Sequence, residues 1–282
     1  MQQTIQWFPG HMTRTKRKIT QLLPLIDIVV EVVDARIPQS SRNPDLDSLL
    51  SSKPRMIVLN KADIADPQTT ERWLNRFRAQ GYAAMTLDCK SGKGLSRFVP
   101  LMREVLKDKL QQWSDKGMEG RPIRAMVVGI PNSGKSSLIN RLTKGAKAKV
   151  EDRPGVTRDQ KWFLVEGGVQ LLDTPGVLWP KFEDQTVAAK LAFTGAIRDE
   201  VLDTEELAFE LMKVLAAGYE SLLRARYKLD GELPDDAWDL LQLIGRKRGM
   251  LIAGGEIDTL RASVMLIDEY RSGKLGRITL DQ

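Results

Sequence analysis

The sequence predicts an α/β fold with a doubly wound, mostly parallel sheet, followed by a small all-helical C-terminal domain. Apolar runs of strand length recur in the first half of the chain and alternate with stretches of helical periodicity, a pattern typical of parallel sheets covered on both faces. After Trp179 the strand signals fade and leucines recur at helical spacing. We therefore expect two domains, residues 1–182 with an N-terminal arm over residues 1–25, and residues 183–282.

The predicted sheet contains apolar runs that we interpret as buried parallel strands. They cover residues 28–33, 56–59, 83–87 and 125–128. Three of them lead directly into polar or glycine-containing segments, at Asp34, Asn60 and Gly129. Because ligands of such sheets bind beyond the carboxyl ends of the strands, we expect a ligand site at these segments.

The helical predictions depend on caps and on periodicity. The clearest helix begins after Asp66, an N-cap residue with Pro67 at the first helical position, and ends at Gly81. Residues 113–123 have the character of a connecting segment. The last helix is predicted to carry one apolar stripe, formed by Ile257, Leu260, Val264 and Ile267.

The composition is that of a globular protein, with 42% hydrophobic and 28% charged residues in a chain of 282. No apolar run approaches the roughly 20 residues needed to cross a bilayer, so we expect no membrane partner. The single cysteine, Cys89, excludes an intramolecular disulfide and favours a reducing compartment, and we expect a cytoplasmic monomer. The net charge of +6 favours a polyanionic partner but does not establish one.

Residues 129–136, Gly-Ile-Pro-Asn-Ser-Gly-Lys-Ser, have the context of a phosphate-binding loop, between an apolar strand and a helix-compatible segment. The glycines let backbone N–H groups close around a phosphate. Lys135 adds a charge toward the β- and γ-phosphates, and the Ser136 hydroxyl can bind Mg²⁺. The predicted nucleotide contacts of this loop are Asn132, Ser133, Gly134, Lys135, Ser136 and Ser137.

Two further motifs fit a Mg²⁺–nucleotide site. Asp173 ends the apolar stretch 169–172, so its carboxylate is expected beside the metal, through a water molecule. The backbone N–H of Gly176 is expected to meet the γ-phosphate and thereby to distinguish GTP from GDP. Thr157 lies between these motifs, where a first switch loop brings a second hydroxyl to Mg²⁺.

Residues 60–63, Asn-Lys-Ala-Asp, follow an apolar strand and predict recognition of guanine. The Asp63 carboxylate can accept hydrogen bonds from N1–H and the exocyclic amine of guanine, whereas adenine presents an acceptor there. Asn60 can bond the other edge of the base, and the Lys61 stem can lie along the ring. Cys89 and Lys90 are assigned to the base site by their position after a strand alone, and a reactive thiol at Cys89 is not favoured.

The order of these motifs is unusual, because Asn60 precedes Gly129 in the chain whereas in a simple G domain the guanine-reading tetrad follows the phosphate-binding loop. One site with its halves exchanged along the chain indicates a circular permutation. Residues 113–123 would then join the former ends of the unpermuted domain. The predicted fold is therefore a circularly permuted P-loop G domain.

These motifs in this order resemble the circularly permuted GTPases. More specifically, four segments resemble the ribosome biogenesis GTPase A family, namely residues 7–12, 33–38, 254–258 and 273–276. The resemblance covers nearly the whole chain. The resemblance implies a GTP hydrolase that binds the immature large (50S) ribosomal subunit, promotes a late assembly step and uses hydrolysis to GDP and phosphate for release. It also implies that the helical domain contacts ribosomal RNA.

A further group is needed to activate the water molecule that attacks the γ-phosphate. Val177 stands where Ras-like proteins have a water-orienting Gln, so intrinsic hydrolysis is expected to be slow. The resemblance points to His11, the only histidine, as the catalytic candidate; the other interpretation is that His11 packs as part of an anchored arm. Lys135 and Thr157 are the other predicted catalytic residues. By analogy with families that have Pro-Asn in this loop, Asn132 is a candidate K⁺ ligand, and the alternative is that it caps the loop.

Two basic clusters are predicted to contact RNA phosphates, although each alone is more often a solvated face. They are Arg14, Lys16, Arg17 and Lys18, and, in the helical domain, Arg246, Lys247 and Arg248. An alternative to the enzyme is a GTP/GDP-switched RNA-binding placeholder with negligible useful turnover. A tRNA-modification or signalling GTPase is disfavoured because no second catalytic or membrane motif accompanies the nucleotide motifs.

Overall fold

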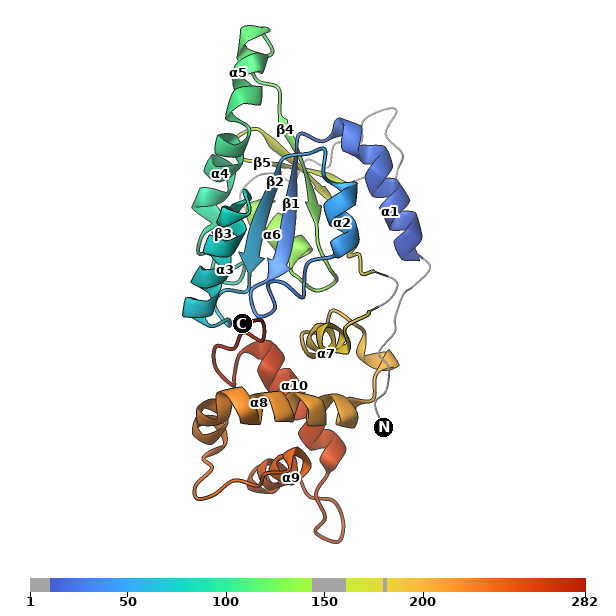
Figure 1. Ribbon diagram of the computed structural model, residues 1–282, viewed down its shortest axis with the longest axis vertical. Coiled ribbons are helices and arrows are strands. Elements are labelled where there is room, and N and C mark those ends of the chain that lie inside the picture. Colours follow the sequence, from blue (N-terminus) through green and yellow to red (C-terminus); the bar gives the residue numbers. More distant parts are fainter. Residues whose placement is uncertain (1–10, 144–160, 180–181) are drawn as a thin grey trace. The chain divides into compact units, whose positions relative to one another are not determined.

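The computed structural model describes the following parts of the chain: residues 11–143, 161–179 and 182–282. Of His11 it describes the backbone only. The chain divides into two compact units (Figure 1). The sheet unit runs to Pro180 and also includes Asp281–Gln282, and the helical unit comprises Lys181–Leu280.

The sheet unit contains a six-stranded sheet with the strand order β3-β2-β1-β4-β6-β5. Its parallel strands are β1 (Ile28–Asp34), β2 (Arg55–Asn60), β3 (Ala83–Thr86), β4 (Ile123–Val128) and β6 (Val169–Asp173). The edge strand β5 (Trp162–Val165) pairs antiparallel with β6, and neither of these two strands has a counterpart among the four predicted strands. The predicted α/β class with a mostly parallel sheet is confirmed.

Strand β1 lies at the centre of the sheet, where all seven of its residues are buried. It pairs with β2 on one side and β4 on the other. Asp34 at the end of β1 stands opposite Asn60 at the end of β2, and β4 leads into the loop that starts at Gly129. The polar segments predicted to hold a ligand therefore meet at one edge of the sheet.

Helices cover both faces of this sheet. Three of the helices described pack against one face of the sheet: α4 (Phe98–Val105), α5 (Lys107–Asp115) and α6 (Lys135–Thr143). Their contacts include Phe98, Trp113 and Leu138. The other face of the sheet is covered by α1 (His11–Leu22), α2 (Pro44–Leu49) and α3 (Pro67–Ala79). Short 3-10 helices occupy Leu23–Leu25 and Leu95–Arg97. The α3 start is as predicted, since the Asp66 side chain accepts a hydrogen bond from the N–H of Thr69 at 2.7 Å.

The prediction that residues 113–123 are all connection was wrong at both ends, since Ile123 is already the first residue of β4. Residues 113–115 are the last residues of α5, and Trp113 is only 7% exposed. The indole packs against the sheet, and the Arg121 guanidinium lies 4.4 Å from its ring centroid. The burial of one large aromatic side chain therefore extends the helix into what the polar composition marked as a linker.

The helical unit consists of four α-helices and one 3-10 helix in the part that the structure describes. They are α7 (Gln185–Phe193), α8 (Thr204–Tyr227), α9 (Ala237–Lys247), α10 (Thr259–Ser272) and the 3-10 helix Asp199–Val201. Helix α8 is interrupted at Tyr219, where φ is −140° and ψ is 29°. None of the helices described is long and apolar enough to cross a membrane.

The apolar stripe predicted for the last helix was wrong. Leu260 and Val264 are 54% and 44% exposed. Ile257 precedes the N-cap residue Asp258 and so lies outside the helix. The buried side is formed instead by Ala262, Ser263, Leu266, Ile267, Glu269 and Tyr270. Large aliphatic residues at helical spacing indicated the wrong phase, because the buried side of α10 also uses small and aromatic side chains.

Candidate nucleotide site

Two segments far apart in the sequence meet at the carboxyl edge of the sheet. The Asn60 side chain donates from Nδ2 to the carbonyl oxygen of Ser133 at 2.9 Å and accepts from the N–H of Cys89 at 3.4 Å. Gly134 lies so close that a Cβ there would overlap the Asn60 amide. Asn60 thus joins the tetrad, the phosphate-binding loop and the loop after β3, a linking role that no pattern in the sequence indicated.

Lys61 has a left-handed backbone with φ of 62°, and its ammonium donates to Asp34 Oδ2 at 2.9 Å. Arg36 Nη2 donates to the same oxygen at 2.7 Å. Burial alone would raise the pKa of the Asp34 carboxyl, but the Arg36 and Lys61 charges outweigh it and hold that pKa well below its usual range. Asp63, two residues beyond Lys61, is half-buried.

The loop after β3 is closed by Asp88, which accepts from the N–H of Lys90 at 2.7 Å. Burial raises the pKa of Asp88, and hydrogen bonds from Ser91 and Lys90 reverse this and lower it. Arg141 of α6 donates to the carbonyl oxygen of Ser91 at 2.9 Å, a link that sequence reasoning missed. Burial raises the pKa of the Cys89 thiol to about 11, with Asp88 adding to the effect, so the thiol stays protonated at neutral pH.

The phosphate-binding loop is tightly packed. Lys135, the first residue of α6, is 6% exposed and donates to the carbonyl oxygen of Ile130 at 2.7 Å. Burial lowers the pKa of Lys135 to about 8, opposed by the nearby Asp173 carboxylate. Asn132 has φ of 58°, a conformation that asparagine adopts more readily than most residues. Ser136 and Ser137 are exposed on the first turn of α6, where backbone N–H groups favour an anion.

Asp173 lies beside this loop. Its Oδ2 accepts from the Ser136 hydroxyl at 3.4 Å, whereas Oδ1 is buried without a hydrogen-bond partner in the described part of the chain. Burial raises the pKa of Asp173, with Lys135 acting in the opposite direction. A hydroxyl and an unsatisfied carboxylate oxygen together fit a hard cation such as Mg²⁺. Thr157, the other predicted ligand, lies outside the described residues.

The turn after Asp173 packs directly on the phosphate-binding loop. A Cβ on Gly176 would lie 2.5 Å from the backbone nitrogen of Pro131, so only glycine fits. Val177 donates its N–H to the carbonyl oxygen of Gly129 at 3.2 Å. Its side chain is 1% exposed and packs in the same apolar cluster as Ile19 of α1. As predicted, Val177 offers nothing to orient a water molecule.

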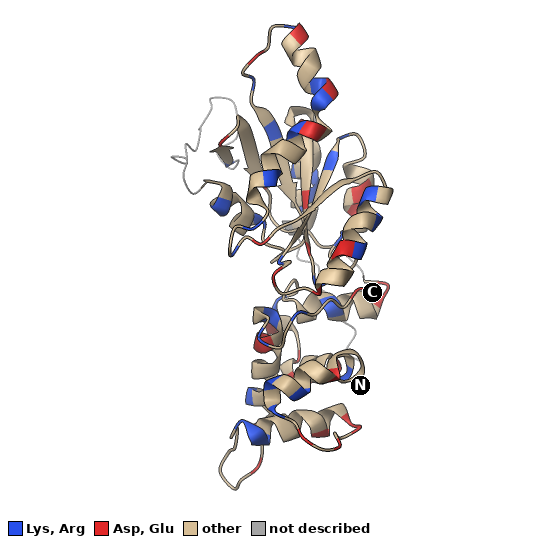
Figure 2. Cartoon of the chain, turned by 90° about the vertical axis from the view of Figure 1, so that its left-hand side faces the viewer, with Lys and Arg blue, Asp and Glu red and all other residues tan. Residues whose placement is uncertain are grey.

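The predicted basic residues differ in their surroundings. In α1, Arg14 and Arg17 are exposed, Lys18 is half-buried, and Lys16 pairs with Asp45 of α2. In the helical unit, Arg246 is exposed, Lys247 lies 3.7 Å from Asp230, and Arg248 lies 3.8 Å from Glu269. Figure 2 shows basic residues scattered over both units among acidic ones. His11 begins α1, but its side chain, like residues 7–10, lies outside the described part.

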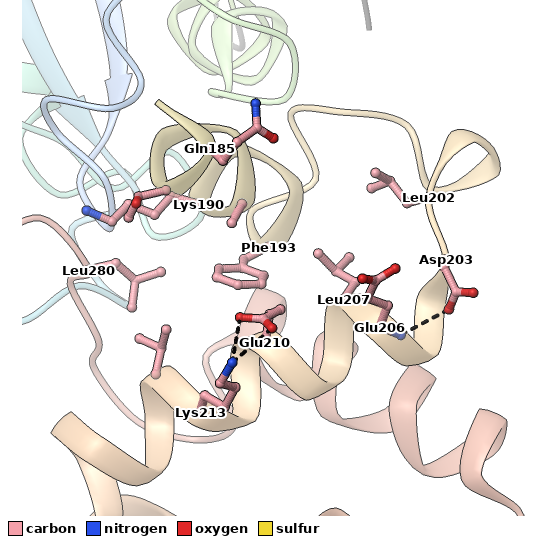
Figure 3. A pocket seen from close by; sticks show the side chains of 13 residues that line it. Gln185, Lys190, Phe193, Leu202, Asp203, Glu206, Leu207, Glu210, Lys213 and Leu280 are labelled. Atoms are coloured by element: carbon pink, nitrogen blue, oxygen red, sulfur yellow. Dashed lines mark hydrogen bonds and ion pairs between the residues drawn. The ribbon is translucent and has the colours of Figure 1, made fainter. Parts of the chain in front are cut away.

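The helical unit also has a cavity of about 410 Å³ between α7 and α8 (Figure 3). Phe193, Leu207 and Leu280 provide apolar walls, and Glu210 pairs with Lys213 at 3.1 Å beside them. None of the residues predicted to bind nucleotide or RNA lines it.

Comparison with known proteins identifies the family. A family model described as 50S ribosome-binding GTPase matches residues 124–218. Ribosome biogenesis GTPase A of Priestia megaterium is 48% identical over 99% of this chain and 96% of its own length. The protein of the same name from Thermotoga maritima is 34% identical over 99% of this chain and 94% of its own length.

Solved structures agree with this result. A GDP-bound structure of YlqF has a TM-score of 0.64 and 31% identity and covers 94% of this chain and 99% of that one. A GNP-bound YlqF from T. maritima has a TM-score of 0.63 and 31% identity, with 95% and 98% covered. The chain therefore belongs to the ribosome biogenesis GTPase A family and is a GTP hydrolase.

Proposed function

We propose that the tetrad of residues 60–63 and the phosphate-binding loop of residues 129–136 form one site for GTP in a circularly permuted GTPase. The observation that carries this proposal is the hydrogen bond from Asn60 Nδ2 to the Ser133 carbonyl oxygen, which brings the two segments together. The domains are taken to be residues 1–182 and 183–282.

In this site Asp63 reads N1–H and the exocyclic amine of guanine, Asn60 and the Lys61 stem support the base, and Cys89 and Lys90 close over it. The phosphates are bound by Asn132, Ser133, Gly134, Lys135, Ser136, Ser137 and the N–H of Gly176.

Ser136, Thr157 and, through water, Asp173 would hold Mg²⁺. When bound, this ion neutralises charge on the β- and γ-phosphates. Asn132 is proposed as a K⁺ ligand. If so, replacing K⁺ with Na⁺ lowers turnover several-fold; equal rates in both salts would leave Asn132 as a residue that only shapes the loop.

The proposed task is to bind the immature 50S subunit in the cytoplasm, to promote a late assembly step and to leave after hydrolysis of GTP. The names of the matched family and relatives support this, as does the net charge of +6. RNA phosphates are proposed to be bound by Arg14, Lys16, Arg17, Lys18, Arg246, Lys247 and Arg248.

His11 is proposed as the catalytic group that replaces the missing Gln. Its backbone begins α1, and Ile19, about 12 Å further along that helix, packs in the cluster that contains Val177. This arrangement keeps α1 near the turn that follows Asp173.

The experiment is GTP hydrolysis by the wild type and His11→Ala, each with and without large subunits. The proposal predicts strong stimulation of the wild type by subunits and little stimulation of the variant. No stimulation of either protein would favour the placeholder function, and equal stimulation of both would make His11 structural.

A further inference from the structure

Residues 33–38 form a segment whose buried charges lie beside the tetrad. Asp34 ends β1, is 2% exposed, and stands in register opposite Asn60 of β2. Four donors converge on its carboxylate. Oδ1 accepts from the backbone N–H and Nε of Arg36, at 3.0 and 2.9 Å, and Oδ2 accepts from Arg36 Nη2 and Lys61 Nζ, at 2.7 and 2.9 Å.

We propose that Asp34 and Arg36 are positioning residues that fix Lys61 of the tetrad, and through it set the affinity for guanine nucleotides. Neither residue would touch the nucleotide. The proposal rests on the proposed function of residues 60–63.

The tetrad needs such a support because Lys61 is flexible. A lysine side chain has many rotamers, and holding its stem along a base costs conformational entropy unless the far end is already anchored. A carboxylate that accepts the ammonium at 2.9 Å supplies that anchor before any ligand binds. Lys61 has a left-handed backbone, with φ of 62°, and its side chain reaches the carboxylate at the end of β1.

Arg36 keeps the Asp34 carboxylate ionised and fixed in place. The residue is 1% exposed, its guanidinium remains charged at every accessible pH, and it binds Asp34 in a bidentate manner. The carboxylate therefore stays ionised and fixed in direction whether or not Lys61 is bound to it. A lone Asp–Lys pair would offer neither property.

A double-mutant cycle tests the proposal. The variants are Asp34→Asn, Lys61→Met and the double variant, and the readout is the dissociation constant for a fluorescent GDP analogue. Each single variant is expected to weaken binding by about tenfold, because the side chain of residue 61 must then be ordered when the nucleotide binds. The double variant should bind no more weakly than the worse single variant, because both remove the same interaction. Single effects that multiply would overturn the proposal.

Two further variants guard against misfolding. Asp34→Glu keeps a negative charge for Arg36 but displaces the carboxylate by one methylene group. It should weaken GDP binding several-fold with Lys61 present and not at all in the Lys61→Met background. An equal loss in both backgrounds would contradict the proposal.

The matched control is Asp27→Asn, next to the opposite end of β1. Asp27 is also 2% exposed and also paired, with Lys109 at 2.7 Å. Loss of the Asp27 charge should lower thermal stability and leave the GDP affinity unchanged. A loss of affinity comparable to that of Asp34→Asn would mean that any buried carboxylate near this strand has the same effect.

The positioning role and the proposed function fail in different ways. If the wild type does not prefer GDP over ADP, the proposed function is wrong. If that preference holds and the single effects multiply in the double variant, only the positioning role is wrong.

Discussion

Two charged clusters of the molecule, Asp34 with Arg36 in the sheet unit and residues 246–248 in the helical unit, hold their charges in opposite ways. In the sheet unit, Asp34 and Arg36 are 2% and 1% exposed and bind each other directly. In the helical unit, Arg246, Lys247 and Arg248 are all exposed, and the ion pairs of the last two are long, at 3.7 and 3.8 Å. Fixed, buried charges suit one small ligand of defined shape, whereas exposed charges suit a polyanion whose phosphates are attracted over a distance.

Burial of charge alone does not mark a ligand site. Glu31, in the middle of β1, is 1% exposed and is paired with Arg42 and Arg55, at 3.2 and 3.0 Å. Both guanidiniums lie over the Tyr82 ring. This cluster neutralises a carboxylate within the fold. What distinguishes Asp34 is its place at the carboxyl edge, beside the tetrad.

The largest effect is expected at Lys135, whose buried charge is proposed to meet the phosphates. Lys135→Gln should weaken GTP binding by about 100-fold, because truncating one side of a buried charged pair typically costs a few kcal/mol. Calorimetry measures this affinity. Lys213→Gln, which removes an exposed charge in the helical unit, should leave the affinity unchanged. Similar losses of affinity in both variants would contradict the distinction between buried and exposed charges.

Asp281 has a buried carboxylate that is not proposed to bind a ligand, so its substitution should affect stability alone. Its carboxylate accepts from the N–H groups of Gln39 and Ser40, at 2.8 and 2.7 Å, and from the Ser40 hydroxyl at 2.7 Å. Asp281→Asn should lower the free energy of unfolding by about 2 kcal/mol, because the charge is lost and an amide donor replaces one of the two accepting oxygens. Denaturant unfolding measures this. The exposed Asp235→Asn serves as control, and equal stabilities of all three proteins would refute the expectation.

The exposed cluster should act through salt-dependent attraction. Replacing Arg246, Lys247 and Arg248 by alanine is expected to weaken binding to large subunits by about tenfold at low salt. It should also make binding less sensitive to salt, by roughly one unit of slope for each phosphate that is no longer neutralised. Co-sedimentation over a salt series measures both. An unchanged slope would remove these residues from the proposed RNA interface, and nucleotide affinity should not change in either case.

A smaller effect follows from the Lys135 pKa of about 8. The ammonium is charged below that pH, and phosphates bound to it favour the charged form, so the pKa rises in the complex. Nucleotide binding should therefore take up a proton near a pH of about 8.5, and affinity should fall several-fold between about pH 7 and pH 9. Calorimetry in buffers of different ionisation enthalpy detects the uptake. Binding without proton exchange over this range would show that the lysine charge is already fixed.

The smallest effect concerns α10 of the helical unit. Leu260→Ser should change the free energy of unfolding by less than about 0.5 kcal/mol, because the side chain is 54% exposed. Leu266→Ala, at a fully buried position of the same helix, should cost about 2–5 kcal/mol. Thermal or denaturant unfolding compares the two variants. Similar losses of unfolding free energy would mean that Leu260 is buried, as the sequence had predicted.

Local patterns predicted much of the fold, for stated physical reasons. The fully buried strand β1 is a continuous apolar run from Ile28 to Val33 apart from Glu31, and α3 has a capping Asp66 followed by Pro67, so both are visible in the sequence. Strand β5 was missed because it is four residues long and half of it is only partly buried. The phase of α10 was missed because small residues carry no periodic signal.

The sequence predicted that the separated nucleotide motifs meet at the carboxyl edge of the sheet, but not the side-chain contacts that join them. The phosphate-binding loop and the tetrad are contiguous motifs and can be found one at a time. The contacts Asn60–Ser133 and Asp34–Lys61 join positions whose proximity depends on which strands pair and in which register. That information is distributed over the whole sheet, and no single stretch of sequence contains it.

The most direct measurement is a calorimetric comparison of GDP, XDP and ADP binding to the wild type and to Asp63→Asn. We predict one GDP per chain, no measurable affinity for ADP, and a switch to XDP in the variant, because the asparagine amide can donate to the xanthine carbonyl that replaces the amine. Equal affinity of the wild type for GDP and ADP, or an Asp63→Asn protein with unaltered base choice, would contradict the single guanine nucleotide site.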